Sequence, residues 1–81
     1  MNATNLEKYD KAFMESFEIE KDRLAGLKYQ DIEAWDSVGH MSLIAALEEA
    51  FDIMMDTDHI IDFSSYERGK EILSQHYDVE F

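Results

Sequence analysis

The sequence predicts an all-α protein, a four-helix bundle of three main helices and one short helix, in a single domain over residues 1–81. The chain contains no proline and only three glycines, so few positions interrupt a helix. Apolar residues recur three or four positions apart, which is the spacing of one helix face. Hydrophobic residues make up 46% of the chain, which is enough for a compact core. A chain of this length buries only about 60–65% of its unfolded surface, which leaves little room for a deep enzymatic cleft.

The first helix is expected over residues 5–18, with Thr4 or Asn5 as its cap. Its apolar face consists of Leu6, Tyr9, Phe13 and Phe17. Residues 19–36 show no clean period, so a long connection is expected there, with a short helical turn around residues 21–24. A structureless connection of this length is unusual in a compact domain. We therefore expect its apolar residues to pin it across the bundle, with Trp35 packed over one end.

The second helix has the clearest pattern and is expected over residues 37–51. The positions expected to face inward are Met41, Ile44, Leu47 and Phe51. Gly39 weakens the first turn by about 1 kcal/mol relative to alanine, which suggests a tolerance or need for a small residue.

Two further helices are expected in the last third of the chain. A short helix over residues 57–61, capped by Asp56 or Thr57, brings Ile60 and Ile61 inward. The last helix begins after Ser64 or Ser65. Its inward residues are expected to be Tyr66, Ile72 and Leu73, in a pattern that Gly69 and Lys70 dilute.

The charge of the chain restricts its partners. Seven basic against nineteen acidic side chains give a formal net charge of -12. Nucleic acid and anionic membranes are poor partners, because phosphate contact needs Lys and Arg, whereas basic protein surfaces are attracted. There is no cysteine, so no disulfide and no cysteine zinc site is expected. Without a signal-peptide pattern or an apolar run of roughly 20 residues, we expect a cytoplasmic monomer with no membrane insertion.

Ser37 lies at the expected start of the second helix, directly after Asp36. Both residue types are preferred N-caps, so capping is one interpretation of this pair. A capping box would place Glu or Gln three residues after Ser37, where His40 stands instead. The other interpretation is that Ser37 accepts a phosphate-linked group, because the free N–H groups and the dipole of a helix start favour an anion.

The segment over residues 35–53 resembles the attachment site of the acyl carrier protein family. Members typically show Asp-Ser-Leu, followed by a helix that ends in acidic residues and Phe. This chain has Asp36-Ser37-Val38, and the expected helix ends in Glu48-Glu49-Ala50-Phe51-Asp52. The chain length, the long first connection, the short third helix and the acidic charge are also similar to that family.

The resemblance implies a discrete carrier protein that is not an enzyme. Ser37 would bear 4′-phosphopantetheine from coenzyme A, with cargo held as a thioester on its thiol. Asp36 would help to position the magnesium-dependent phosphopantetheinyl transferase, and Val38 would contact partners near the arm. An acidic surface of Glu48, Glu49, Asp52, Asp56 and Asp58 would meet basic patches on acyl-ligase, synthase or acyltransferase enzymes. The inward apolar residues of the second and third helices could part to admit an acyl chain.

Several residues depart from carriers of bulk fatty acid synthesis. Gly39 and Ser42 stand where those carriers usually have acids, and Ala50 interrupts the acidic run. Residues 35–40 instead resemble carriers of specialised pathways, so acyl cargo for lipid, polyketide or surface-polysaccharide biosynthesis is expected. The Trp-Asp-Ser context is also similar to D-alanyl carriers, which leaves aminoacyl or peptidyl cargo open. A third alternative is an unmodified acidic adaptor that binds a basic protein.

Other candidate sites are weaker. His40 is expected to be solvent-exposed, although it shares a helix face with Ser37 and could touch the phosphate of the arm. A hydrolase is not expected, since Trp35 occupies the first glycine position of a nucleophile elbow. The acids of residues 52–62 lack the spacing of a calcium loop, and no metal site is expected there or at the histidines.

Overall fold

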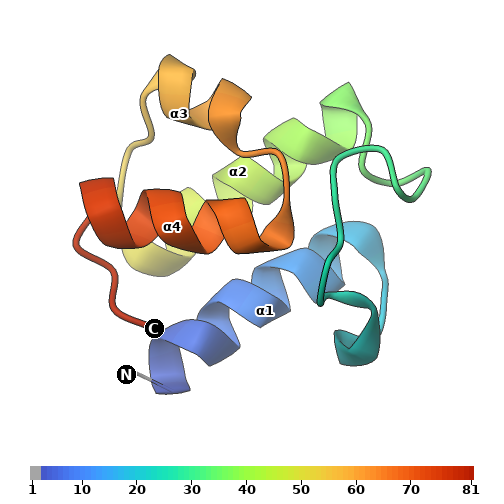
Figure 1. Ribbon diagram of the computed structural model, residues 1–81, viewed down its shortest axis with the longest axis horizontal. Helices are drawn as coiled ribbons and strands as arrows, with labels where there is room; N and C mark the ends of the chain where they lie inside the picture. Colours follow the sequence, from blue (N-terminus) through green and yellow to red (C-terminus); the bar gives the residue numbers. More distant parts are fainter. Residues whose placement is uncertain (1–2) are drawn as a thin grey trace.

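The computed structural model describes residues 3–81, and four α-helices and no strand lie within them (Figure 1). The helices are α1 (Ala3–Phe17), α2 (Ser37–Phe51), α3 (Thr57–Asp62) and α4 (Tyr66–His76). A single 3-10 turn, η1 (Lys21–Arg23), lies in the long connection between α1 and α2. The described part of the chain is a small all-α bundle with a radius of gyration of 11.4 Å, which confirms the predicted fold class at this level.

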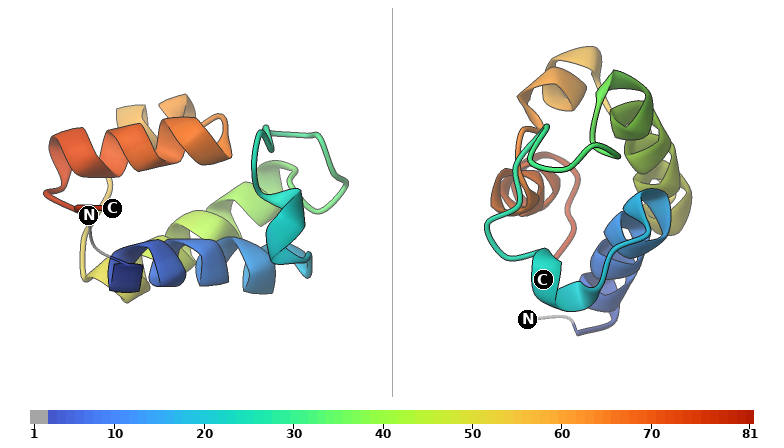
Figure 2. Two further views of the ribbon diagram at one scale, coloured as in Figure 1. Left: turned by 60° about the horizontal axis from the view of Figure 1, so that its bottom comes forward. Right: turned by 90° about the vertical axis from the view of Figure 1, so that its right-hand side faces the viewer.

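The helices form two layers with the short helix at one edge (Figure 2). α1 and α2 lie side by side in one layer, α4 lies across them in the other, and α3 lies beside α2 on the side away from α1 (Figures 1 and 2). After α4 the chain returns to α1, where the Asn5 Nδ2 donates to the Glu80 carbonyl at 3.0 Å. The Phe81 ring lies 5.2 Å from that of Tyr9.

The core is a cluster of aromatic rings surrounded by aliphatic side chains. Phe13 of α1 is at its centre, with ring centroids 5.5 Å from Trp35 and 5.3 Å from Tyr66. Aromatic pairs at such distances add to the free energy gained by burial of their area. The fully buried large side chains are Trp35, Tyr9, Phe13, Phe63, Leu24, Leu43, Ile44, Leu47, Ile72 and Leu73. Trp35 is packed in this cluster and not exposed, as expected.

The connection over residues 18–36 is fixed to the bundle by both apolar and backbone contacts. Leu24 and Leu27 are buried. The Tyr66 N–H donates to the Leu27 carbonyl at 2.9 Å, and the Tyr29 N–H donates to the Ser64 carbonyl at 2.9 Å. These bonds join the connection to Ser64 and to the start of α4, and the burial of Leu24 and Leu27 agrees with the expectation that apolar residues pin it to the bundle.

A buried polar contact joins α1 to α4. The Tyr66 hydroxyl donates to Asp10 Oδ1, and the Tyr9 hydroxyl donates to the Tyr66 carbonyl at 2.6 Å. Asp10 is buried, and the Lys21 Nζ lies 3.9 Å from its Oδ2. Burial, together with the carboxylate of Asp10, raises the pKa of the Tyr66 hydroxyl, and burial raises that of the Tyr9 hydroxyl in the same way.

Gly69 corrects one interpretation of the last helix. It does not merely dilute the apolar pattern, because a Cβ at Gly69 would lie 2.2 Å from both Phe63 Cζ and the Tyr9 hydroxyl oxygen. Only glycine allows α4 to approach these rings so closely. Lys70, the other diluting residue, places its Nζ 4.6 Å from the centroid of the Tyr66 ring.

The start of the first helix was predicted wrongly. Neither Thr4 nor Asn5 caps α1, because the helix begins at Ala3 and both lie within it. The Asn5 side chain bonds to the returning C-terminal segment instead. The helix ends at Phe17, since Glu18 has a left-handed φ of 54°.

The inward positions of α2 and α3 were also predicted in part wrongly. Met41 and Ile61 are 54% and 74% exposed, whereas Ile44 and Leu47 are buried. The helical period identifies residues on one face but does not show how much of that face a neighbouring element covers. Ile44 and Leu47 lie in the middle of α2, which packs against α1, whereas Met41 and Ile61 line the open depression between α2 and α3.

Candidate functional site

Asp36, and not Ser37, caps α2. The Asp36 backbone is extended, its Oδ1 accepts from the Gly39 N–H at 2.8 Å, and its carbonyl accepts from the His40 N–H at 2.8 Å. Ser37 is the first residue of the helix. The capping interpretation of Ser37 is therefore wrong, because the neighbouring carboxylate already provides the cap.

Ser37 is exposed and available for reaction. Within residues 3–81, no group hydrogen-bonds its hydroxyl, and the N–H groups of Ser37 and Val38 have no acceptor. Free N–H groups at the start of a 15-residue helix favour an anion beside them. A phosphodiester on Ser37 would thus meet the unpaired N–H groups of Ser37 and Val38.

Gly39 is required by a close approach of the connection to α2. A Cβ at Gly39 would lie 1.8 Å from the Ala34 carbonyl oxygen, an approach that backbone atoms cannot relieve without moving. This geometry explains the glycine in the first helical turn that the sequence left as a tolerance or a need. It keeps the chain before Ser37 folded back against α2.

An apolar depression of about 390 Å³ opens beside Ser37, between α2, α3 and the long connection. Ser37, His40 and Met41 contribute from α2, and Ile60 and Ile61 contribute from α3. Tyr29, Phe63 and Ser64 complete the lining. A concave apolar surface with a few polar groups is the usual character of a small-molecule site.

His40 is half-buried and hydrogen-bonded at both ring nitrogens, so its predicted solvent exposure is wrong. The Trp35 Nε1 lies 2.9 Å from His40 Nδ1, and His40 Nε2 lies 2.8 Å from the Ile60 carbonyl oxygen. An indole N–H left without an acceptor in the core would cost about 1–3 kcal/mol, so this partner contributes to stability.

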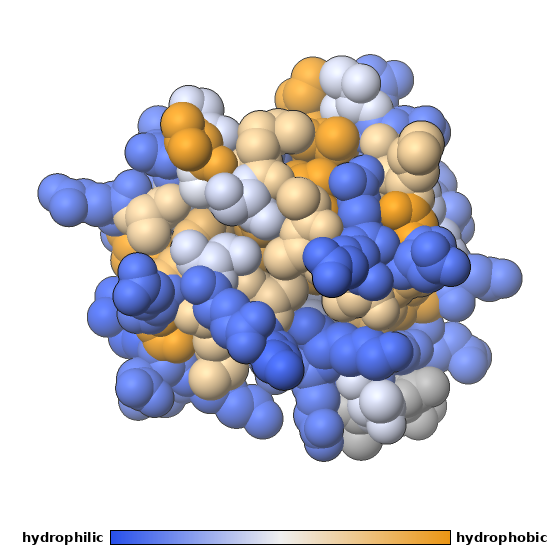
Figure 3. All heavy atoms as spheres, turned by 180° about the vertical axis from the view of Figure 1, so that it is seen from behind, coloured by the Kyte–Doolittle hydropathy of each residue, from blue (hydrophilic) through white to orange (hydrophobic). Residues whose placement is uncertain are grey.

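Apolar side chains are exposed around the helix start and along the layer of α1 and α2. Val38 is 75% exposed and Met54 86% exposed, in addition to Met41 and Ile61. Viewed from behind, apolar residues spread across the face of this layer and are bordered by hydrophilic ones (Figure 3). We call Val38 and Met41, on the first turns of α2, and Ile61, which lines the same depression as Met41, the apolar patch. Exposed apolar residues that gather in this way mark contact surfaces for other molecules.

The predicted acidic residues at the end of α2 lie far from Ser37 and serve different local roles. Glu48 lies eleven positions after Ser37 in the helix, which is about 16 Å along its axis at 1.5 Å per residue. The half-buried Glu48 accepts from the Met55 N–H at 2.9 Å and so holds the connection to α3. Asp52 is exposed and ends the helix in a left-handed conformation.

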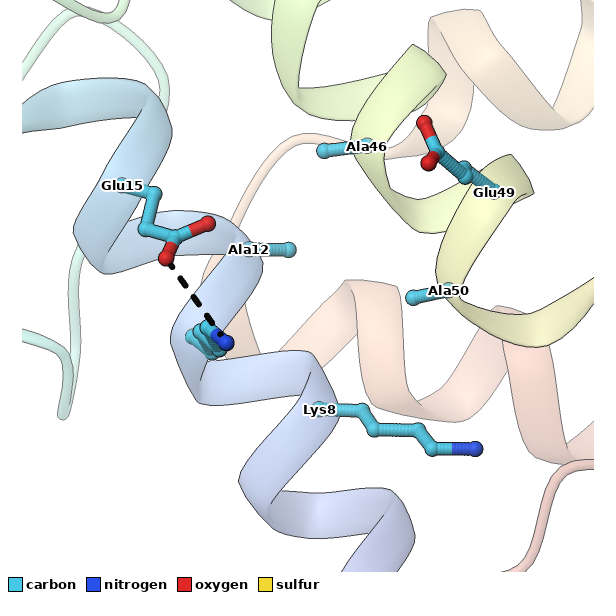
Figure 4. Close-up of a pocket in the computed structure, with 7 residues that line it drawn as sticks. Lys8, Ala12, Glu15, Ala46, Glu49 and Ala50 are labelled. Atoms are coloured by element: carbon cyan, nitrogen blue, oxygen red, sulfur yellow. Dashed lines mark ion pairs between the residues drawn. The ribbon is translucent and has the colours of Figure 1, made fainter.

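Glu49 faces a different surface from Glu48. It lines a depression of about 340 Å³ between α1 and α2, where Ala12, Ala46 and Ala50 form the floor (Figure 4). Lys8 reaches toward this groove, while Lys11 is 3.9 Å from Glu15 (Figure 4). The acids at the end of α2 therefore do not form one acidic patch around Ser37.

Asp56 and Asp58 lie at the start of α3 and are exposed. Asp56 occupies the predicted cap position, but its side chain makes no capping bond. Its N–H donates to the Tyr77 hydroxyl at 2.8 Å. Both carboxylates remain free for an approaching basic group.

Polar contacts join α3 to α4 and to Tyr77 after it. The Tyr77 hydroxyl lies 2.6 Å from His59 Nδ1, and the Arg68 guanidinium pairs with Asp62. The Arg68 guanidinium holds the pKa of Asp62 below its usual value. No side chain of α3 is buried.

The histidines do not assemble a metal site. The rings of His59 and His76 stack with centroids 4.3 Å apart. Over residues 3–81, no group of three or more His, Cys, Asp or Glu side chains lies close enough to hold a metal ion. No helix in the same range combines the length and the apolar character needed to cross a bilayer.

Comparison with known proteins identifies no relative. No protein-family model matches the chain, and neither the curated proteins nor the solved structures contain a match to it.

The sequence did not reveal the contacts around His40. Trp35 and His40 are five residues apart and lie on either side of the helix start, so no helical or strand period connects them. Tyr29 and Ser64 reach the depression only because the connection pairs with the segment before α4. Such long-range pairings leave no signal in a single sequence.

Proposed function

We propose that this chain is a carrier protein whose Ser37 hydroxyl bears 4′-phosphopantetheine. The observation that supports it most is the exposed Ser37 at the start of α2, with its hydroxyl unpaired within residues 3–81 and the apolar depression beside it. The arm supplies a terminal thiol on which an acyl group is held as a thioester. The protein presents this group to enzymes and performs no chemistry on it.

The helix start suits the covalent link. Asp36 occupies the cap with Gly39, which leaves the N–H groups of Ser37 and Val38 to bond a phosphate oxygen. The likeness of residues 35–53 to the attachment site of acyl carrier proteins supports the same assignment, and with it an acyl-carrier-type fold.

The apolar patch supports a role in contacting enzymes close to Ser37. Val38 and Met41 lie within the first five residues of α2 and are exposed, so an enzyme that reaches Ser37 also meets them. Asp56 and Asp58 at the start of α3 are exposed and would add electrostatic attraction to basic partners, whereas Glu49 and Asp52 lie at the far end of α2. Enzymes with a basic surface around an apolar centre therefore fit this face, including acyl-ligase, synthase or acyltransferase enzymes.

The decisive experiment is an intact-mass measurement after incubation with coenzyme A, magnesium and a broad-specificity phosphopantetheinyl transferase. The wild-type protein should gain the mass of one phosphopantetheine. Ser37→Ala should gain none. Ser42→Ala, on the exposed face of the same helix, and Ser64→Ala, in the lining of the depression, should both gain the full mass.

Two outcomes would redirect the proposal. Modification of Ser37→Ala would place the arm on another residue. No modification of folded wild-type protein, with the transferase active on a control carrier, would contradict the carrier function and favour the unmodified acidic adaptor. If Ser37 is modified, loading by an acyl ligase rather than by an amino-acid-activating enzyme distinguishes acyl from aminoacyl cargo.

A further inference from the structure

The two hydrogen bonds of His40 define its tautomer. An indole N–H can only donate, so His40 Nδ1 must accept from Trp35 Nε1 at 2.9 Å. A carbonyl oxygen can only accept, so His40 Nε2 must carry the proton that lies toward the Ile60 oxygen at 2.8 Å. The imidazole is therefore neutral, with its proton on Nε2, and it joins the long connection, α2 and α3.

The bond to Ile60 holds a short helix that has no fully buried side chain of its own. This helix has only six residues and no buried side chain. Ile60 lies in the last turn of α3, where carbonyl oxygens receive no hydrogen bond from an N–H group of the helix itself. Within residues 3–81, the His40–Ile60 contact is the one hydrogen bond that joins α2 directly to α3.

The same residues form opposite walls of the depression beside Ser37. His40 and Met41 belong to the α2 wall, and Ile60 and Ile61 belong to the α3 wall. The aromatic side chains packed around the imidazole are Tyr29, Trp35 and Phe63. A bond between the two walls sets how far they stand apart.

We propose that His40 is a positioning residue, which holds α3 against α2 and thereby sets the opening of the depression beside Ser37. Its functional meaning rests on the proposed carrier role, since a group attached to Ser37 would meet a depression whose walls are held together. The contact itself exists in the unmodified protein. The experiment therefore uses unmodified protein, so that failure of this inference is separate from failure of the carrier function.

Two substitutions separate the two bonds of the imidazole. The amide of His40→Gln can place its NH₂ where Nε2 stands and keep the bond to Ile60, while the indole loses its acceptor. The shorter His40→Asn can place its oxygen where Nδ1 stands and keep the bond to Trp35, while Ile60 is released. Each variant is therefore the control for the other, because each removes one hydrogen bond of residue 40 and keeps the other.

Amide hydrogen exchange and the fluorescence of the single tryptophan give the two readouts. In His40→Asn, the amides of Ile60 and Phe63 should exchange about five- to tenfold faster than in wild type, the factor expected for one hydrogen bond, with α1 unchanged. In His40→Gln these amides should keep near wild-type rates, while the emission of Trp35 shifts. Equal exchange of α3 in both variants, or a uniform acceleration in all helices, would overturn the proposal.

The tautomer of His40 can also be measured in the wild-type protein, so this test does not depend on a variant that folds. Nitrogen-15 spectra of the imidazole at neutral pH should show His40 Nε2 bonded to hydrogen and Nδ1 without hydrogen. A proton on Nδ1 would contradict the assigned contacts and with them the positioning role.

Discussion

Asp36 has two roles that can be separated at the level of a single residue. Its Oδ1 caps α2 through the Gly39 N–H, and its charge stands next to the proposed attachment residue. The capping role needs only an oxygen acceptor, which asparagine also provides. Any role in positioning a transferase, as the resemblance to carrier proteins implies, depends on the negative charge.

The substitutions Asp36→Asn and Asp36→Ala should therefore act differently. Asp36→Ala should lower the free energy of unfolding by about 0.5–2 kcal/mol, because the Gly39 N–H loses its acceptor. Asp36→Asn should unfold near the wild-type urea midpoint but be modified on Ser37 more slowly. Urea denaturation followed by circular dichroism, together with the initial rate of mass gain, measures both effects. If Asp36→Asn is modified at the wild-type rate, the charge of Asp36 has no role in modification and the residue serves only as the cap of α2.

At the scale of the helices, the contact between α1 and α4 determines the response to alkaline pH. Tyr9 and Tyr66 hold their protons more tightly in the folded protein, because burial raises the pKa of each hydroxyl. A raised folded-state pKa means that their contribution to stability is complete below the unfolded value of about 10 and is lost as the pH rises above it.

The urea midpoint should accordingly fall as the pH is raised above about 10, and the absorbance of ionised tyrosine should appear together with loss of helix. Tyr66→Phe should make this alkaline loss shallower, because one of the two ionising groups is removed. The same variant should be less stable at neutral pH, since Asp10 loses its hydroxyl donor. An alkaline dependence identical to that of wild type would assign the effect to other groups.

Sequence patterns predicted the bounds and caps of the helices better than they predicted which side chains are buried. The bounds of α2 follow from the spacing of Ile44, Leu47 and Phe51, and Ser65 caps α4 through the Arg68 N–H, as a serine before a helix predicts. Met41 shares that spacing and is nevertheless exposed, because burial depends on which element lies opposite. Gly69 likewise reflects a close approach to Phe63, a contact between different elements.

In the candidate site, too, local features could be predicted from the sequence, whereas contacts between elements could not. Ser37 at a helix start was readable from the sequence, since capping residues and helical spacing are local signals. The link from His40 to Ile60 spans 20 residues, and the acids at the end of α2 are separated by the rotation of the helix. Neither fact could be obtained without the positions of α3 and α1.

At the scale of the whole molecule, the net charge of -12 opposes folding. Compaction brings like charges together, and salt screens them, with a Debye length that falls from about 30 Å at 0.01 M to about 3 Å at 1 M. We therefore expect the melting temperature to rise with sodium chloride over this range. Thermal denaturation followed by circular dichroism measures it, and a melting temperature that is flat or falls with salt would contradict the expectation.

Two adjacent methionines of this molecule differ sharply in their exposure to solvent. Met54 is 86% exposed in the connection between α2 and α3, and the next residue, Met55, is 6% exposed in the core. A peroxide therefore reaches the Met54 sulfur without any opening of the fold, whereas the Met55 sulfur is shielded. Conversion of Met54 to the sulfoxide makes an exposed apolar side chain polar and leaves the core intact. Oxidation of Met54 should therefore precede any loss of folding, and a reductase could reverse it.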